Sequence, residues 1–219
     1  MLNTQPVSGI ISYLIKTHDP REIIITGSYA DGTYNANSDF DCWLIGRDES
    51  RARHDTSIVN GIELQAEIYP MHYFMNMPMR QIEFFIDVVI AYDPEGAAKQ
   101  FMDHVQDCLA HDPCMPPEIK GQRMAYFEKM LRRAAVQDFH GDLRGHLMLF
   151  QTMEAWCDFS DRVYLGTKKT LRLMEQADPE SAAIYRRAMR TFDIADIQAW
   201  ISRLRSVYES GGGRETRIL

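Results

Sequence analysis

A proline-rich segment, HDPCMPPE at residues 111–118, separates two halves of the chain that differ in hydrophobic periodicity. Before it, short apolar runs alternate with helical patterns. After it, every segment has the spacing of about 3.6 residues that is typical of an amphipathic helix. Three prolines in eight residues interrupt helices and strands alike, so a domain boundary is expected here. We therefore predict an α+β fold, with a mixed-sheet domain over residues 1–112, a helical bundle over 113–210 and a flexible tail over 211–219.

The first half is predicted to contain both kinds of element. Apolar residues at helical spacing indicate a helix over 6–18, which ends at His18-Asp19-Pro20. A second helix is expected at about 97–110, and strands are expected at 22–26, 40–45, 58–69 and 84–92. The third strand alternates, so that Glu63, Gln65 and Glu67 share its polar face.

The second half is predicted to be entirely helical, with helices near 118–138, 142–164, 167–176, 179–190 and 193–209. In the second of these helices, six apolar residues form one stripe, which we expect to face the core of the bundle. They are Leu143, Leu147, Phe150, Met153, Trp156 and Cys157.

Composition limits the classes of partner. The chain has 24 Lys and Arg against 31 Asp and Glu, a formal net charge of −7, which argues against a protein whose main task is to hold a nucleic-acid backbone. Apolar stretches are far shorter than the roughly 20 residues of a membrane span, and the N-terminus lacks the features of a signal peptide. We expect a cytoplasmic protein with no membrane partner.

The polar stretch GSYADGTYNANSDFD, residues 27–41, follows an apolar strand and leads into another. Gly27 allows a phosphate close to the backbone, and Ser28 offers a hydroxyl and an amide donor where a helix begins. Asp39 and Asp41 are two positions apart, so both carboxylates project from one face of a strand. Such carboxylates suit Mg²⁺, which binds protein carboxylates together with substrate phosphates. The stretch therefore predicts a site for a metal and a phosphorylated ligand.

A second metal ion would need a third carboxylate, and the polar face of the 58–69 strand offers Glu67 and Glu63. We favour Glu67. Two ions about 4 Å apart would stabilise the attacking and leaving oxygens of an in-line displacement at phosphorus. A charged face on a half-exposed strand is also common without any metal, so the alternative that these glutamates are ordinary solvated surface residues stays open.

The order of apolar strand, Gly-Ser, ten residues and Asp-Phe-Asp resembles the signature of the DNA polymerase β-type nucleotidyltransferase superfamily. The likeness is to its minimal branch, which includes aminoglycoside and lincosamide nucleotidyltransferases. It implies that Gly27 and Ser28 contact the phosphates of an NTP, with Ser38 as a further nucleotide contact. It also implies that Asp39 and Asp41 bind Mg²⁺ with a third acid nearby. Here the chain departs from the pattern, because Gln65 stands where related sequences often place that acid.

The layout of a sheet domain followed by a helical bundle resembles the antibiotic-modifying members. In those enzymes a basic residue reaches the triphosphate, a role that Lys168 or Lys169 would suit here, although both also read as ordinary first-turn residues of a helix. A carboxylate outside the metal set often acts as the general base. Three residues could fill that role: Glu154, Asp158 and Asp161.

The resemblance implies Mg²⁺-dependent transfer of a nucleoside monophosphate from an NTP to the hydroxyl of a small molecule, such as an aminoglycoside-like antibiotic. Two alternatives stay open. One is a toxin-type nucleotidyltransferase that modifies tRNA or protein. The other is a non-catalytic nucleotide-binding or antitoxin-like module.

Overall fold

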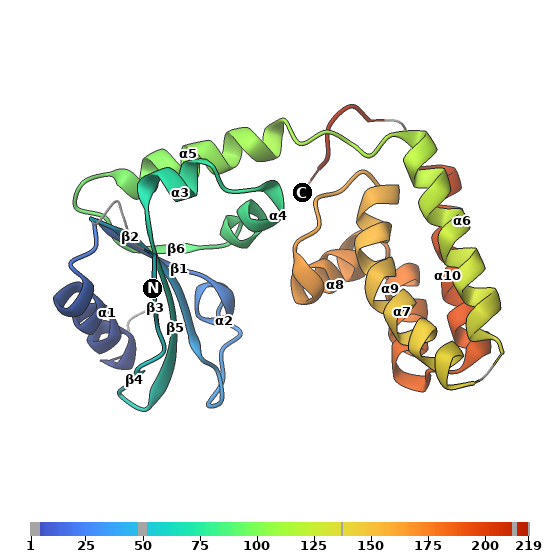
Figure 1. Ribbon diagram of the computed structural model, residues 1–219, viewed down its shortest axis with the longest axis horizontal. Coiled ribbons are helices and arrows are strands. Elements are labelled where there is room, and N and C mark those ends of the chain that lie inside the picture. Colours follow the sequence, from blue (N-terminus) through green and yellow to red (C-terminus); the bar gives the residue numbers. More distant parts are fainter. Residues whose placement is uncertain (1–4, 48–51, 137, 212–213, 219) are drawn as a thin grey trace. The chain divides into compact units, whose positions relative to one another are not determined.

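The computed structural model describes residues 5–47, 52–136, 138–211 and 214–218. The chain divides into two compact units, Met1–Cys108 and Leu109–Leu219 (Figure 1). The first unit contains a mixed sheet with helices, and the second contains helices. Together they form an α+β protein with a helical C-terminal region, as the sequence predicted.

The sheet of the first unit has the strand order β3-β5-β2-β1-β6, with β4 paired to β5. β1 is antiparallel to β2 and β6, whereas β2 and β5 are parallel. The elements are α1 (Gln5–His18), β1 (Glu22–Ile25), α2 (Gly27–Asp31), β2 (Phe40–Gly46), β3 (Arg53–Asp55), β4 (Ile58–Val59), β5 (Ile62–Pro70), α3 (Met71–Met75), α4 (Met79–Ile82), the 3₁₀ turn η1 (Glu83–Phe85), β6 (Val89–Tyr92) and α5 (Ala97–Ala110).

The two faces of this sheet are covered differently. On one face, apolar residues of α1 pack on the inward-facing residues of β1, β2 and β5 to form the core (Figure 1). On the other face, Trp43 of β2 contacts Phe74 of α3 and Phe85 of η1, with ring centroids 6.1 and 5.3 Å apart. The second face also carries the alternate residues of β2 and β5, and these are polar near the N-terminal ends of the strands.

The strand expected over 84–92 is shorter than predicted. The segment starts with η1, and β6 covers only Val89–Tyr92. Phe85 is fully buried against Phe101 of α5, with ring centroids 4.7 Å apart. The apolar start of this run therefore fills the layer between sheet and helix, and only its second part joins the sheet.

The second unit consists of helices packed around one apolar core that includes the fully buried Trp156 and Trp200. Its helices are α6 (Pro117–Ala134), α7 (Phe139–Phe159), α8 (Gly166–Ala177), α9 (Pro179–Thr191) and α10 (Ile194–Ser210). No helix in the described parts of the chain is long and apolar enough to cross a membrane.

The apolar stripe predicted on α7 is only partly correct. Met153, Trp156 and Cys157 are buried, but Leu143, Leu147 and Phe150 are 48%, 49% and 63% exposed. The buried side in this part of α7 is instead formed by a neighbouring stripe that includes Gly145, Met148 and Leu149. Gly145 has no side chain, so Phe192 approaches the helix there: a Cβ added to Gly145 would lie 3.0 Å from the Phe192 ring.

The C-terminal segment, which the sequence predicted to be a flexible tail, makes backbone hydrogen bonds. The amide of Cys114 donates to the carbonyl of Glu215, and the amide of Val163 donates to that of Ile218. The Arg217 guanidinium lies 2.9 Å from a carboxylate oxygen of Asp158 and 3.3 Å from one of Asp112. These contacts hold residues 214–218 against the segment before α6 and the loop after α7.

Candidate active site

The Gly-Ser pair and the second aspartate meet where β1 ends. Ile25 pairs with Cys42, and the amide of Thr26 donates to the carbonyl of Asp41 over 3.0 Å. The chain then turns into α2 at Gly27, which has a φ of +63°. A Cβ at Gly27 would lie 2.3 Å from Oδ2 of Asp41, closer than any side chain tolerates. Glycine is therefore favoured at this position by the backbone conformation, and a side chain here would displace the Asp41 carboxylate.

Asp39 and Asp41 lie at the N-terminal end of β2. Asp41 is half-buried within the strand, and Asp39 is exposed just before it. Because they are two residues apart, they face the same side of the sheet, which is the side opposite α1. Ser28, in the first turn of α2, is half-buried on the β1 side of the aspartates.

The register between β2 and β5 places each candidate for a third carboxylate. Asp41 pairs with Gln65, and Trp43 pairs with Glu67. The ladder begins at the pair Phe40 and Leu64, so Asp39 and Glu63 occupy the positions just before it on each strand. Glu63 is thus beside Asp39, and the neutral amide of Gln65 is beside Asp41. Glu67 is two residues further along β5 and is beside neither aspartate.

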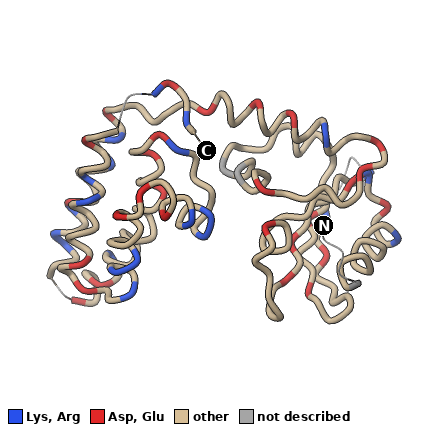
Figure 2. The backbone as a smooth tube through the Cα atoms, turned by 180° about the vertical axis from the view of Figure 1, so that it is seen from behind, with Lys and Arg blue, Asp and Glu red and all other residues tan. Residues whose placement is uncertain are grey.

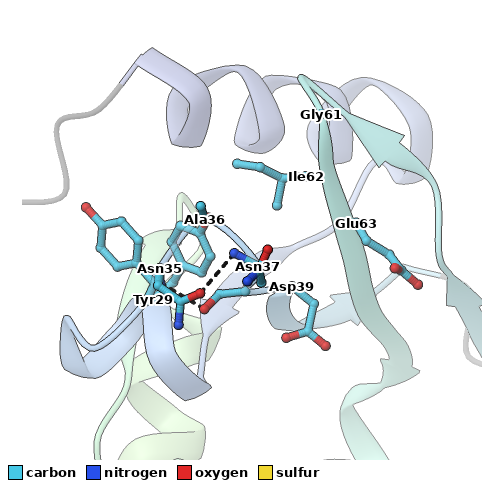
Figure 3. Close-up of a pocket in the computed structure, with 10 residues that line it drawn as sticks. Tyr29, Asn35, Ala36, Asn37, Asp39, Gly61, Ile62 and Glu63 are labelled. Atoms are coloured by element: carbon cyan, nitrogen blue, oxygen red, sulfur yellow. Dashed lines mark hydrogen bonds between the residues drawn. The ribbon is translucent and has the colours of Figure 1, made fainter.

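A cavity of about 570 Å³ opens beside Asp39 (Figure 3). Asp39 and Glu63 lie on its wall, together with a loop held by short polar contacts, in which the amide of Asn35 donates to the Ser38 hydroxyl over 2.9 Å. The ring of Tyr34 stacks on that of Tyr29, with centroids 4.5 Å apart. The structure therefore brings Ser38, Asp39 and Glu63 to a single pocket.

Glu67 has a different set of neighbours. Its carboxylate lies 3.7 Å from Nε2 of His54 on β3. Burial, the charge of Glu67 and a hydrogen bond to it raise the pKa of the Tyr69 hydroxyl. Since β3 flanks β5 on the edge away from β2, Glu67 is held on the side away from Asp41.

His54 is a residue of this region that the sequence did not single out. It lies in the charged segment 46–56, which reads as a surface connection. His54 lies opposite Glu67 because β3 pairs with β5 in an antiparallel arrangement. The residues around His54 contain no sequence pattern that predicts this pairing.

The remaining candidates lie in the second unit. Lys168 and Lys169 are in the first turn of α8. Asp158 and Asp161 are 2% and 1% exposed and are engaged in ion pairs, Asp158 with Arg123 and Arg217 and Asp161 with Lys120. Glu154 is more exposed, with an oxygen 3.4 Å from Arg123. The two buried aspartates thus have a structural role in this unit.

The donor set on β2 and β5 suits a hard cation that shares its ligands with a nucleotide. Asp39, Asp41 and Glu63 supply only carboxylate oxygens, the ligands that Mg²⁺ prefers. Within the described residues, no three His, Cys, Asp or Glu side chains are gathered as a metal-binding group.

Comparison with known proteins points to one family. The model of a family described as nucleotidyltransferase domain matches residues 7–146. No curated protein matches this chain significantly.

Two solved structures share low similarity with the chain. One is a nucleotidyltransferase-like protein from Exiguobacterium sibiricum 255-15, with 13% identity, a TM-score of 0.35 and coverage of 94% of this chain and 74% of that one. The other is described as a toxin-antitoxin with AMP-PNP, with 14% identity, a TM-score of 0.33 and coverage of 54% of this chain and 94% of that one.

Proposed function

Because the chain belongs to the nucleotidyltransferase domain family, we propose that it transfers a nucleoside monophosphate from an NTP to a hydroxyl group of a small molecule, with Mg²⁺ as cofactor. In this reaction the acceptor hydroxyl gives up its proton to a base, and its oxygen forms a bond to the α-phosphorus of the NTP. The bond between that phosphorus and the bridging oxygen breaks, and pyrophosphate leaves.

The proposal assigns the phosphates to Gly27 and Ser28, with Ser38 as a further nucleotide contact. Asp39 and Asp41, with Glu63 in preference to Glu67, would hold two Mg²⁺ ions. When bound, these ions would neutralise charge on the phosphate oxygens during transfer. The family resemblance also predicts that Lys168 or Lys169 contacts the triphosphate.

One observation carries the proposal: the contact between Gly27 and the carboxylate of Asp41. A phosphate bound at the Gly-Ser turn and a cation bound at Asp41 would be immediate neighbours. A cation that bridges protein carboxylates and substrate phosphates requires this arrangement. A merely structural polar loop does not require it.

The distribution of charge favours a cationic acceptor over a nucleic acid. Residues 1–108 contain 7 of the 24 Lys and Arg but 16 of the 31 Asp and Glu, and acidic positions dominate the first unit in Figure 2. A unit of this charge attracts cations and repels a polyanion such as tRNA. We therefore favour an amine-bearing small molecule, of which an aminoglycoside-like antibiotic is one example.

The test is a transfer assay with α-labelled NTPs, Mg²⁺ and a panel of acceptors: aminoglycosides, lincosamides, tRNA and hydroxyl-bearing peptides. Transfer appears as a mass gain of one nucleotide on an acceptor, with release of pyrophosphate. We expect Asp39→Asn and Asp41→Asn to lower turnover by more than about 100-fold, and Asp103→Asn, an exposed carboxylate on α5, to leave it unchanged. Full turnover in either of the first two variants would refute the assignment. Metal-independent NTP binding without transfer would favour a non-catalytic module.

A further inference from the structure

The second unit carries an apolar surface outside its core. On α7, Leu143, Leu147 and Phe150 are 48%, 49% and 63% exposed, and Phe139 in the first turn is 77% exposed. Spacings of four, four and three residues place these side chains in one row along the helix, opposite the side chains that α7 buries. The face opposite a buried stripe is normally polar, so this row is unusual for a helix that packs in a bundle.

The helix α6 borders this row. Nη2 of Arg123 on α6 lies 3.4 Å from Oε2 of Glu154, which follows Phe150 by four residues. The row therefore runs alongside α6. Tyr126 is three residues after Arg123 and is 44% exposed, so it extends the apolar area onto α6. We call this area the α6–α7 surface, and its residues are Tyr126, Phe139, Leu143, Leu147 and Phe150.

Positive charges border the α6–α7 surface. Lys129 and Arg133 follow Tyr126 by three and seven residues, so the three side chains share one side of α6. Both cations are exposed, and neither forms an ion pair with any residue that the structure describes. A Cβ added to Gly141 would lie 3.2 Å from the carbonyl oxygen of Arg133, so this end of α6 is next to the first turn of α7. The apolar row thus has a cationic border on its α6 side.

The dimensions of the row fit a single helix. Leu143, Leu147 and Phe150 have the alternating spacing of four and three residues with which one helix packs on another along a seam. From Phe139 to Phe150 the row is about 16 Å long, or about three turns of a helix, and it is one side chain wide. A helix that binds a lipid surface has a broad apolar face opposite a strongly charged one. Opposite this row, α7 is instead buried in the core.

The charges discriminate between a second copy of this chain and a different partner. A second copy would bring an identical set of cations against Lys129 and Arg133, and juxtaposed like charges oppose association. A helix with Asp or Glu beside its apolar stripe would place carboxylates against these cations. The charges therefore favour an acidic amphipathic helix as the occupant.

We propose that the α6–α7 surface binds an acidic amphipathic helix of a partner protein. The apolar side chains of that helix pack on Leu143, Leu147 and Phe150, and its carboxylates pair with Lys129 and Arg133. This is the mode in which an amphipathic helix is recognised through apolar anchors three and four residues apart. The inference does not depend on the proposed transfer reaction, because every residue that it uses lies in the second unit.

The test uses the full chain and a fluorescent peptide of 21 residues, the length of α7, with anisotropy as the readout. The peptide has Leu at the a and d positions of each heptad and Glu at e and g, which also opposes pairing of the peptide with itself. Two control peptides have Lys in place of Glu, or the same composition without an apolar stripe. Vesicles of phosphatidylcholine and phosphatidylserine test a lipid surface, and sedimentation equilibrium tests a second copy.

The variants remove the apolar anchors and the cations separately. Leu147→Ala and Phe150→Ala each truncate one anchor, and Lys129→Gln combined with Arg133→Gln removes the cationic border. Met189→Ala is the matched control for the apolar variants, since Met189 lies on α9 and is also 49% exposed. Circular dichroism establishes that each variant is folded.

We expect the acidic peptide to bind saturably and the two control peptides not to bind. Each apolar variant and the double charge variant should weaken binding of the acidic peptide by about 10-fold or more. The double charge variant should also make the remaining binding less sensitive to salt. Met189→Ala should bind as the wild-type chain does. So should Lys16→Gln combined with Arg190→Gln, which removes two exposed charges outside the α6–α7 surface.

Three results would overturn the inference. The first is that the wild-type chain does not bind the acidic peptide, or binds the lysine peptide equally well. The second is that affinity for the acidic peptide is unchanged in both Leu147→Ala and Phe150→Ala. The third is a different occupant, shown by binding of the vesicles in place of the peptide or by a dimer of the wild-type chain that Leu147→Ala dissociates.

Discussion

The Cα of Gly27 faces the Asp41 carboxylate so closely that a methyl group on it would lie 2.3 Å from Oδ2. Gly27→Ala should therefore displace the Asp41 side chain and lower turnover by about 100-fold, the usual cost of misplacing a reacting group by about 1 Å. The measurement is pyrophosphate release, with circular dichroism to establish that the variant is folded.

Gly32→Ala is the matched control for that variant. Gly32 also has a positive φ, +77°, but no atom lies within 4 Å of an added Cβ. Both alanines carry a backbone strain of about 1–2 kcal/mol, and only the one at position 27 reaches an aspartate. Equal losses of activity in the two variants would show that strain alone, and not the contact with Asp41, is responsible.

The proximity of Gly27 and Asp41 could be predicted from the sequence because its signals are local, whereas the roles of both residues stay predictions. A glycine at a strand end and two aspartates at the start of the next strand lie within fifteen residues. Which glutamate stands beside Asp39 depends on the register of β2 against β5, and the sequence does not contain that register. A shift of two residues would exchange Glu63 for Gln65 on the same polar face, with no change in hydrophobic pattern. His54 is missed for the same reason.

The buried carboxyl group of Glu22 makes stability depend on pH. Glu22 is fully buried at the start of β1, and neither of its oxygens has a hydrogen-bond partner among the described residues. Burial, reinforced by Asp93, raises its pKa from 4.5 to about 8. Between these values the unfolded chain ionises and the folded chain retains its proton, so the free energy of unfolding falls as pH rises, by at most about 1.4 kcal/mol per pH unit.

Glu22→Gln removes this titration, so the variant should lose the part of the pH dependence between 4.5 and 8 that this carboxyl group contributes. The measurement is urea unfolding of both proteins at several pH values in this range. We expect the stability of the variant relative to the wild-type chain to increase with pH. Parallel stability curves would contradict the assignment of this pH dependence to Glu22.

Arg217 should stabilise the second unit through its two carboxylate partners. It lies within 3.3 Å of Asp112 and 2.9 Å of Asp158, and the side chain of Asp158 is only 2% exposed. Removing one partner of a buried ion pair costs about 3–5 kcal/mol. We expect the cost of Arg217→Ala to be near the lower end of this range, because Asp158 keeps its ion pair with Arg123.

Thermal and urea unfolding of Arg217→Ala measure this cost. Arg214→Ala is the control, since Arg214 is exposed and its guanidinium donates to the backbone carbonyl of Ser160 and lies at the surface. We expect it to change stability by less than about 1 kcal/mol. An equally small effect of Arg217→Ala would mean that the C-terminal segment contributes little to the fold.

The helices of the second unit could be predicted because prolines and polar residues separate long segments with helical periodicity. The buried face of α7 could not be predicted. Leu143, Leu147 and Phe150 continue the apolar stripe of Met153 and Trp156 at helical spacing. The sequence gives no sign that the packing partner lies along another face. Phe192, which packs at Gly145, comes from a segment more than 40 residues away in sequence. Periodicity finds an apolar face, but tertiary packing decides which face is covered.

Two leucines on α7 test this conclusion, because the same Leu→Ala substitution can be made on its buried face and on its exposed face. Leu149 is 1% exposed, and Leu147 is 49% exposed. Leu149→Ala should therefore lower the free energy of unfolding by about 2–5 kcal/mol, since it leaves a cavity in the core. Leu147→Ala should change it by about 0.5 kcal/mol or less. Urea unfolding of the two variants at the same protein concentration provides the comparison. A large loss in Leu147→Ala would mean that its side chain is covered in solution and that the face predicted from the sequence is the buried one after all.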